Sequence, residues 1–218
     1  MKIGSTYIHK CPQCANLMLR RTLDSGNSFG ATIYSDGKVF APQCLEFPLI
    51  TICSKCSQIF WLNDESYTGI ESRYFIEEHE GTAVEDSRFL TFNEYVHAAE
   101  AKIYKTIDQE IFIRQHIWWE FNHRKSTGLS FFKSDSEELL WRANINRLLE
   151  LFDPSDVYQR ILIAELNRHL GNFEECLEII VKLDDNPQWA RYKAYYSEDC
   201  KNKSTKVFVL SALFNPRD

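Results

Sequence analysis

Two Cys-x-x-Cys pairs near the start of the chain have the composition of a metal site. Cys11 and Cys14 form the first pair, and Cys53 and Cys56 form the second, with 38 residues between them. Zn²⁺ favours four tetrahedral ligands, and thiolates bind it well. Two such turns, each carried by a hairpin-like element, close a zinc ribbon. We therefore expect a structural zinc ion, because four cysteines leave no coordination position for water or substrate.

The pairs depart from the usual zinc-ribbon pattern in two respects. A glycine commonly follows the second cysteine, where a positive φ is wanted, but this chain has Ala15 and Ser57 there. The separation of the pairs also exceeds the commonest spacing. A thiol redox motif and an accidental spacing are the alternatives. A redox pair usually lies at a helix N-terminus after a strand and needs no second pair, whereas strand signals flank this duplicated pair.

The sequence leaves open whether another cysteine or a histidine replaces one of the four cysteine ligands. Cys44 and His9 each lie close enough in sequence to a pair to replace one of its ligands. The complete set of four cysteines favours a buried or free thiol for Cys44. We expect Cys176 to pack within a helix, and Cys200 to be exposed at a polar helix end.

The first 66 residues carry strand and turn signals. Residues 28–42, "SFGATIYSDGKVFAP", predict a hairpin, with Asp36-Gly37 supplying residues that tolerate positive φ in the turn. The segments "FPLITIC" and "SQIFWLND" predict short strands on either side of the second cysteine pair. Residues 67–91 show little clear period, and we interpret them as a connector.

From about residue 92 the pattern becomes helical. Thr91 is a plausible N-cap, and the helical period continues over residues 106–125 until "STG" ends it. Another helix is expected after the Ser/Asp cluster near residue 135. Its predicted apolar face, interrupted by Asn144 and Asn146, consists of Leu139, Leu140, Ala143, Leu148, Leu149 and Phe152. The end of the chain, "KVFVLSALF", predicts a short helix or a strand.

Residues 155–185 predict a helix, a Gly171-Asn172 break and a second helix. This stretch resembles a tetratricopeptide-type unit, in which small and apolar residues surround the turn. One unit matches well, and because a solenoid normally needs about three, neighbouring helices must cap it. The residues at the matching positions are Ala164, Leu166, Leu170, Gly171, Phe173, Cys176, Leu177 and Ile180.

Together these patterns predict an α+β protein. Residues 1–66 would form a small β-rich zinc-ribbon-like module, residues 67–91 a connector, and residues 92–218 an all-α, tetratricopeptide-like domain.

The pattern of polar and glycine residues between the cysteine pairs, together with motifs after them, resembles that of an uncharacterised group of bacterial proteins. In that group an "SGN-x-x-G-x-x-x-x-SDGK" run precedes the second pair, "FW" follows it, and a helical tail carries "AEL-x-R-x-x-G-x-F". The resemblance spans both halves of the chain, so it implies that the architecture is inherited as a unit, but it implies no activity. The matching residues are Ser25 to Asn27, Gly30, Ser35 to Lys38, Phe60, Trp61, Ala164 to Leu166, Gly171 and Phe173.

Two groups of polar residues are candidates for ligand binding. The first lies on turns of the predicted module, where loops on a rigid scaffold can bind ligands, although turn chemistry alone also explains these residues. The second lies on the helix that contains "HIWWEFNHRK", where an amphipathic helix with solvated polar residues is the simpler alternative. The candidates are Asn27, Asp36, Lys38, His116, Glu120, Asn122, His123 and Arg124.

The composition favours some functional classes over others. The chain has 218 residues and a formal charge of −6, with +3 in residues 1–60 and −9 in the remainder. Such a balance is not that of a protein built to coat nucleic acid or an anionic membrane. No signal peptide or membrane-spanning window is recognisable, so a cytoplasmic protein is expected.

We therefore expect a non-enzymatic interaction or adaptor protein, in which helical repeats offer a groove to a protein or peptide partner. A nucleic-acid-binding ribbon is the alternative, with contacts from Arg20, Arg21, Lys38, Lys55 and Trp61, but phosphate neutralisation would require more positive charge. A thiol redox or enzymatic protein is a third hypothesis.

Overall fold

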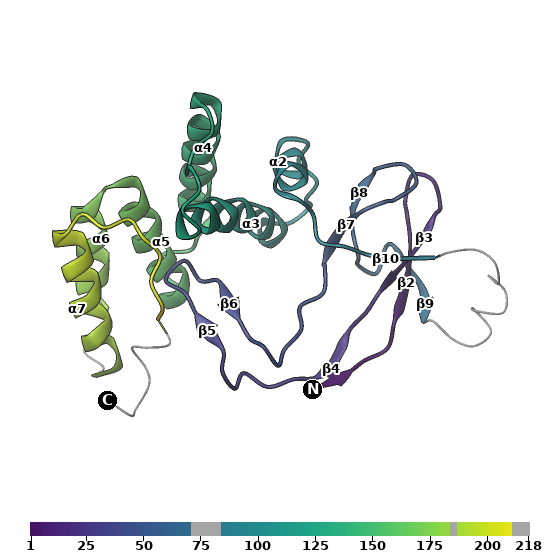
Figure 1. Ribbon diagram of the computed structural model, residues 1–218, viewed down its shortest axis with the longest axis horizontal. Coiled ribbons are helices and arrows are strands. Elements are labelled where there is room, and N and C mark those ends of the chain that lie inside the picture. Colours follow the sequence, from purple (N-terminus) through teal and green to yellow (C-terminus); the bar gives the residue numbers. More distant parts are fainter. Residues whose placement is uncertain (71–83, 184–186, 211–218) are drawn as a thin grey trace. The chain divides into compact units, whose positions relative to one another are not determined.

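The chain begins with short strands and continues with helices, which confirms the predicted α+β class (Figure 1). The structure is a computed structural model that describes residues 1–70, 84–183 and 187–210. The strands are β1 (Lys2–Ile3), β2 (Tyr7–Lys10), β3 (Leu17–Arg20), β4 (Leu23–Ser25), β5 (Thr32–Ile33), β6 (Val39–Phe40), β7 (Ile50–Ile52), β8 (Ile59–Trp61), β9 (Tyr67–Ile70) and β10 (Glu85–Asp86). The helices are α2 (Phe92–Glu100), α3 (Ile107–Ser126), α4 (Asp135–Leu151), α5 (Val157–Leu170), α6 (Phe173–Val181) and α7 (Pro187–Lys201).

The chain forms two compact units. The first, which we call the strand unit, comprises Met1–Ala31 and Ala41–Ile103, and the second, the helical unit, comprises Thr32–Phe40 and Tyr104–Asp218. The chain thus leaves the strand unit for one hairpin and then returns to it.

The domain boundaries predicted from sequence remain a prediction. The contacts within the structure, however, place two segments in a different unit from the predicted one. Residues 32–40 belong with the helices rather than with the predicted module 1–66. Helix α2 belongs with the strands rather than with the predicted domain 92–218. Residues 71–83 of the predicted connector lie outside the described part of the chain.

The main sheet of the strand unit has the order β10-β3-β2-β9. Strand β2 is antiparallel to both β3 and β9, and β10 pairs in parallel with β3. A second antiparallel pair, β7 and β8, flanks the second cysteine pair, which confirms the two short strands predicted there. Each cysteine pair therefore lies at the tip of a two-stranded hairpin.

A small apolar cluster of the strand unit surrounds the cysteine pairs. It consists of Cys11, Met18, Cys53, Phe60 and Leu62, with Cys14 and Cys56 packed against it. Helix α2 begins at the predicted N-cap Thr91, whose side chain accepts from the Glu94 N–H while the Glu94 carboxylate accepts from the Thr91 N–H. This reciprocal capping box fixes the start of the helix, because both backbone donors are satisfied.

The hairpin predicted around Asp36-Gly37 is present. Strands β5 and β6 are antiparallel, and the Tyr34 N–H donates to the Lys38 carbonyl at 2.9 Å. Gly37 has φ 78°, the left-handed residue that a three-residue hairpin loop requires. The chain end extends this sheet, since the Leu210 N–H donates to the Ile33 carbonyl at 2.7 Å. Of the final segment predicted as a short helix or a strand, the described residues 206–210 thus include a β-bridge from Val209 to Tyr34. Residues 211–218 lie outside the described part of the chain.

Each of the next three helices of the helical unit begins at a side-chain N-cap. Thr106, Ser134 and Asp156 accept hydrogen bonds from the backbone at the starts of α3, α4 and α5. Gly171 ends α5 in the left-handed conformation, with φ 86°, and α6 follows at once. The predicted helix, break and helix are therefore confirmed.

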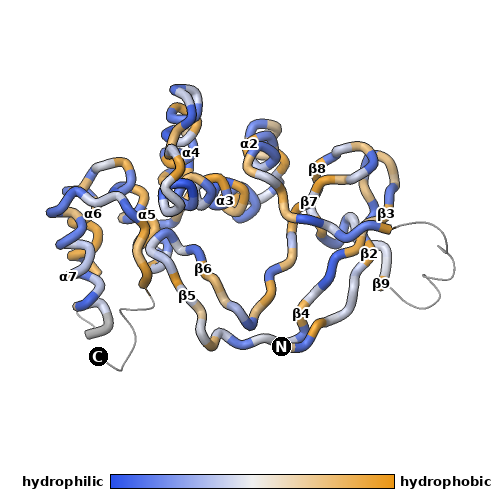
Figure 2. Tube along the Cα trace, viewed as in Figure 1, coloured by the Kyte–Doolittle hydropathy of each residue, from blue (hydrophilic) through white to orange (hydrophobic). Residues whose placement is uncertain are grey.

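Apolar and polar segments alternate along the helices, as the orange and blue stretches of Figure 2 show. The prediction of the apolar face of α4 was wrong in part. Leu139 is 69% exposed, whereas Asn144 is only 2% exposed and donates to the Arg114 carbonyl at 3.0 Å. Helix α3 supplies a polar partner for Asn144, so this face of α4 is buried although it contains an amide.

Within the described residues, no helix has the length and apolarity needed to cross a membrane.

Candidate metal centre and hairpin cavity

The first cysteine pair lies on a tight turn between β2 and β3. The Cys11 N–H donates to the Asn16 carbonyl at 2.8 Å, and the Ala15 N–H donates back to the Cys11 carbonyl at 3.0 Å. We call such a turn a cysteine knuckle. Closure of the turn by its own backbone directs both sulfurs to the same side.

The second cysteine pair lies on an equivalent turn between β7 and β8. The Cys53 N–H donates to the Gln58 carbonyl, and the Ser57 N–H donates to the Cys53 carbonyl, both at 2.9 Å. The two knuckles thus repeat the same hydrogen bonds at the same relative positions. Such repetition is not expected of two accidental Cys-x-x-Cys spacings.

Both knuckles have a positive φ directly after their second cysteine. Ala15 has φ 62° and Ser57 has φ 59°, in the left-handed region that non-glycine residues rarely adopt. The sequence lacks the usual glycine, yet the backbone keeps the conformation that the glycine would provide. The left-handed conformation costs a non-glycine residue about 1 kcal/mol. This cost is consistent with turns held by interactions stronger than the backbone preferences of Ala15 and Ser57.

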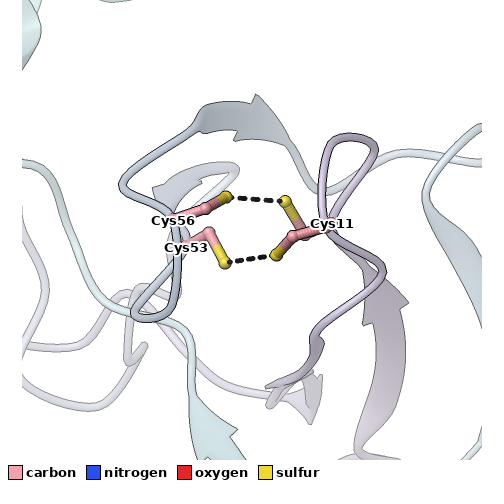
Figure 3. Close-up of side chains that lie close together, drawn as sticks. Cys11, Cys53 and Cys56 are labelled. Carbon is pink, nitrogen blue, oxygen red and sulfur yellow. Dashed lines mark hydrogen bonds between the residues drawn. The ribbon is translucent and has the colours of Figure 1, made fainter.

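The four sulfurs of the two knuckles form one cluster (Figure 3). The Sγ atoms of Cys11 and Cys56 are 3.6 Å apart, as are those of Cys14 and Cys53, and all four lie within 4.8 Å of one another. A disulfide bond would require about 2.05 Å. Sulfurs at the corners of a tetrahedron around a metal bound at about 2.3 Å would be about 3.8 Å apart. The cluster therefore fits a tetrahedral metal ion.

The acidity of the cluster is uneven. Burial opposes ionisation of the Cys53 thiol, but the N–H groups of Cys56 and Lys55 outweigh burial and lower its pKa to about 7. The Gln58 N–H lowers the pKa of Cys56, but burial and contacts with the other three thiols raise it further, to about 12. One thiolate therefore forms near neutral pH, and the full set requires a cation to compensate the charge.

The two residues that could have replaced a ligand lie outside the cluster. Cys44 is exposed. His9 is buried, and its Nδ1 lies 2.9 Å from Ser66 Oγ. Burial, and then the charge of Arg20, lowers the pKa of His9 to about 4. Among the residues that the structure describes, the cluster consists of the four paired cysteines.

The remaining cysteines are both buried. Cys176 on α6 packs as expected, but the prediction that Cys200 is exposed was wrong. Cys200 belongs to the same apolar cluster as Cys176, because α7 packs its end against α6. Burial raises the pKa of both thiols, which makes them poor nucleophiles.

The helical unit brings together four of the candidate ligand-binding residues. Asp36, at the hairpin tip, is buried, and its Oδ2 accepts from Asn122 Nδ2 at 2.8 Å. Its carbonyl accepts from Trp119 Nε1 at 3.0 Å. The tip residues and α3 border a cavity of about 330 Å³, which we call the hairpin cavity. It is lined by Tyr34, Asp36, Lys38, Phe40, Trp119, Asn122, His123, Ser126 and Val207.

The carboxyl group at the hairpin tip is unusual in its acidity. Burial raises the pKa of Asp36, while hydrogen bonds from Asn122 and from the Lys38 N–H act against the increase. These two donors hold the carboxylate in place. Asp36 therefore serves to anchor the tip, and Lys38 and His123 are among the polar groups of the lining that remain for a ligand.

The other candidate residues lie elsewhere. Asn27 belongs to the strand unit, where it caps a turn by accepting from the Phe29 N–H at 2.9 Å. His116 is directed to the Phe112 carbonyl, and burial lowers its pKa to about 4. Arg124 pairs with Glu137 at 2.8 Å, and Glu120 is partly buried outside the lining of the hairpin cavity.

A buried ionic network was not predicted from the sequence. Ser35 Oγ donates to Glu165 Oε1 at 2.6 Å, and Arg168 binds both oxygens of the same carboxylate. His169 Nε2 lies 3.2 Å from Glu165 Oε1. Burial opposes ionisation of Glu165, but His169 and Arg168 outweigh it and lower the pKa of the carboxyl group. In the sequence, Glu165, Arg168 and His169 are spaced i, i+3 and i+4, which places them on one face of a helix.

Aromatic residues of the hairpin cavity were missed as well. Tyr34 and Phe40 read as ordinary strand residues, and Trp119 as one of two adjacent tryptophans in an amphipathic helix. No local pattern places a strand residue against a helix that follows it by about 80 residues.

The comparisons add no relationship to this geometry. No protein-family model, curated protein or solved structure matches the chain.

Proposed function

We propose that this chain is a non-enzymatic protein-binding protein. Its strand unit holds one structural zinc ion, and its helical unit recognises a protein or peptide partner at the hairpin cavity. The observation that carries the proposal is the cavity itself, which has aromatic walls and an exposed apolar rim.

Zinc is the metal that suits the cysteine cluster best. Four thiolates in a tetrahedral arrangement form a closed structural site, and soft sulfur ligands disfavour magnesium and calcium. The ion would offset the charge that the clustered thiols cannot accumulate alone. The zinc then organises the strand unit and takes no part in a reaction.

The hairpin cavity has the features of an anchor pocket at a protein interface. Its volume of about 330 Å³ suits one large apolar side chain, and such anchors supply most of the affinity in many interfaces. Strand β6 next to it exposes both of its residues, with Phe40 60% exposed. Apolar surface beyond the cavity favours an extended partner over a compact small molecule.

The charges at the rim favour a particular partner chemistry. Lys38 and His123 are both at the cavity, whereas its acidic residue, Asp36, is buried and already hydrogen-bonded. We therefore expect a peptide segment with an aromatic or aliphatic anchor beside an acidic residue. Helices α5 and α6 would act as a single tetratricopeptide-like unit that supports the hairpin.

The arginines proposed for nucleic-acid contact favour a protein partner instead. Arg21 is paired with Asp86 at 2.7 Å, and Arg20 is partly buried with Nη1 directed to the Leu62 carbonyl. Arg21 is thus paired and Arg20 lines a cavity of the strand unit, so neither side chain belongs to an open basic surface that could follow a nucleic-acid backbone.

The experiment is selection from a displayed library of random peptides against the immobilised, zinc-loaded full chain. Selected peptides should share an apolar anchor with an adjacent acidic residue. Trp119→Ala should weaken their binding at least tenfold, and Lys38→Glu should weaken it by a smaller factor, because the anchor contributes more than a rim charge.

The matched control is Leu139→Ala, which removes an exposed apolar side chain from α4 outside the cavity. It should leave peptide binding unchanged. If the selected peptides bind Trp119→Ala as tightly as the unaltered chain, the hairpin cavity is not the recognition site and the proposal fails.

A further inference from the structure

The strand unit contains a second cavity on the face of its main sheet. It has a volume of about 470 Å³ and lies within the strand unit, apart from the hairpin cavity of the helical unit. Its floor comes from three neighbouring strands, with Tyr7 and His9 on β2, Arg20 on β3 and Tyr67 on β9. The register pairs Tyr7 with Arg20 and His9 with Tyr67, which places these side chains on one face.

Two buried nitrogens at this cavity have no hydrogen-bond partner among the described residues. They are Nε2 of His9 and Nε of Arg20. The His9 side chain belongs to a residue that is only 2% exposed. A buried polar atom without a partner is destabilising, so two at one cavity indicate that a group from outside the chain satisfies them.

The other ring nitrogen of His9 is held by a serine that can serve either tautomer. Ser66 Oγ accepts from the Asn63 N–H and lies 2.9 Å from both His9 Nδ1 and the Trp61 carbonyl. If the hydroxyl proton turns to the histidine, Nε2 carries a hydrogen and becomes a donor toward the cavity. The site can therefore offer an N–H from His9 beside the guanidinium of Arg20.

The guanidinium of Arg20 is the charged donor of the cavity, which the carboxylate of Asp64 also lines. Burial lowers the pKa of Arg20, and no carboxylate of the described residues forms an ion pair with it. Its one hydrogen bond runs from Nη1 to the Leu62 carbonyl at 3.4 Å, which is long. A partly desolvated cation of this kind is stabilised by a bound anion.

We propose that this cavity binds a small ligand carrying a carboxylate or phosphate group. Arg20 and His9 donate to the oxyanion, and the rings of Tyr7 and Tyr67 contact an apolar or planar remainder of the ligand. The two tyrosine rings are edge to face with centroids 5.7 Å apart, and Tyr67 is 43% exposed, so aromatic surface of the site is accessible to such a group. The cavity volume lies within the range of ligand pockets.

The test uses the zinc-loaded full chain labelled with ¹⁵N and titrated separately with inorganic phosphate, acetate, phenyl phosphate and benzoate. Binding should shift the Nε2 resonance of His9 more than the resonances of the other histidines. We expect affinities near 1 mM for the bare anions and at least fivefold tighter for the aryl compounds, because the tyrosine rings add contact area. Binding of only the phosphate pair or only the carboxylate pair would assign the oxyanion class.

Arg20→Gln should weaken binding of every anion at least tenfold, and Arg20→Lys should restore part of the affinity. Arg21→Gln is the matched control, because the adjacent Arg21 is exposed and already paired with Asp86. Zinc content measured on each variant shows whether the strand unit is intact. The proposal is overturned if no anion moves the His9 signal, or if Arg20→Gln binds as tightly as the unaltered, zinc-replete chain.

Discussion

The two units of this protein differ in what holds them together. In the strand unit, the apolar cluster around the metal site has five buried residues, two of which are cysteines of that site. The helical unit contains a larger apolar cluster of ten buried residues, together with fully buried side chains such as Trp118 and Phe121. Small units rarely bury enough apolar area to be stable alone and commonly use a metal. The comparison therefore leads us to expect that the strand unit depends on a bound ion, whereas the helical unit depends on packing.

Removing the metal should have the largest effect, confined to the strand unit. A structural zinc ion supplies about 10–16 kcal/mol in small zinc modules, which is as large as the whole stability of a typical domain, about 5–15 kcal/mol. Chelation, or Cys53→Ser, should therefore expose the amides of β2, β3, β7 and β8 to hydrogen exchange while α3 to α6 stay protected. The measurement is residue-resolved exchange by mass spectrometry.

Cys44→Ser is the control for that experiment, since Cys44 is an exposed thiol outside the cluster. It should change neither zinc content nor exchange. Protected strands in a metal-free preparation would break the comparison, because the strand unit would then be held by packing as well.

Breaking the buried ion pair should have the next largest effect, in the helical unit. Arg168 is fully buried and, besides Glu165, donates to the Ser204 and Lys206 carbonyls. Arg168→Met would leave the buried Glu165 carboxylate with Ser35 and His169 but without its permanent cation, at a cost of about 3–5 kcal/mol. Urea unfolding of the zinc-loaded chain, followed by tryptophan fluorescence, measures the loss.

The double variant Arg168→Met with Glu165→Leu should be more stable than Arg168→Met alone, because no unpaired charge remains. Arg142→Met removes an exposed pair with Glu138 and should cost less than about 1 kcal/mol. Equal losses in Arg168→Met and Arg142→Met would mean that the buried network does not stabilise the helical unit.

Acid should weaken the helical unit through Glu110. Hydrogen bonds from Arg147, opposed by burial and aided by Arg114, lower the pKa of Glu110 from an ordinary value near 4.5 to about 2. Because the folded pKa is depressed, its stabilisation is present above about pH 4.5 and is lost as pH falls toward 2. Glu110→Gln should cost about 2 kcal/mol at pH 7 and progressively less below pH 4.5.

Urea unfolding of both forms at several pH values measures this difference, with Glu138→Gln as the control on an exposed carboxylate. A constant difference between Glu110→Gln and the unaltered chain from pH 7 to pH 2 would contradict the assignment of the ion pair.

Relieving backbone strain in a knuckle should give the smallest effect, and a favourable one. Ala15→Gly removes the steric cost of φ 62° and should stabilise the zinc-loaded strand unit by about 0.5–1 kcal/mol. The same change at Ala99, in the last turn of α2, should destabilise by up to about 1 kcal/mol, since glycine has a lower helix propensity than alanine. Thermal unfolding compares the two variants, and a loss of stability in both would refute the proposed strain.

Much of the local structure could be predicted because it depends on residues close together in the chain. Thr91 begins α2, Gly37 closes its hairpin and Gly171 ends α5 through side-chain caps and left-handed glycines that act within one turn. The metal cluster was predicted in the same way, since each pair of cysteines is fixed by its own knuckle. What could not be predicted was the exposure of Leu139 and the burial of Asn144, which depend on a partner helix.

The sequence by itself determined the α+β order, the turns, the caps and the four cysteines that meet. Only the tertiary structure decided that the hairpin of residues 32–40 joins the helices, and that His9 and Arg20 share a cavity. The physical reason is the distance along the chain over which each interaction acts. Caps, turns and helical periods act over a few residues and leave a pattern there, whereas the bond from Ser35 to Glu165 joins residues 130 positions apart and leaves none.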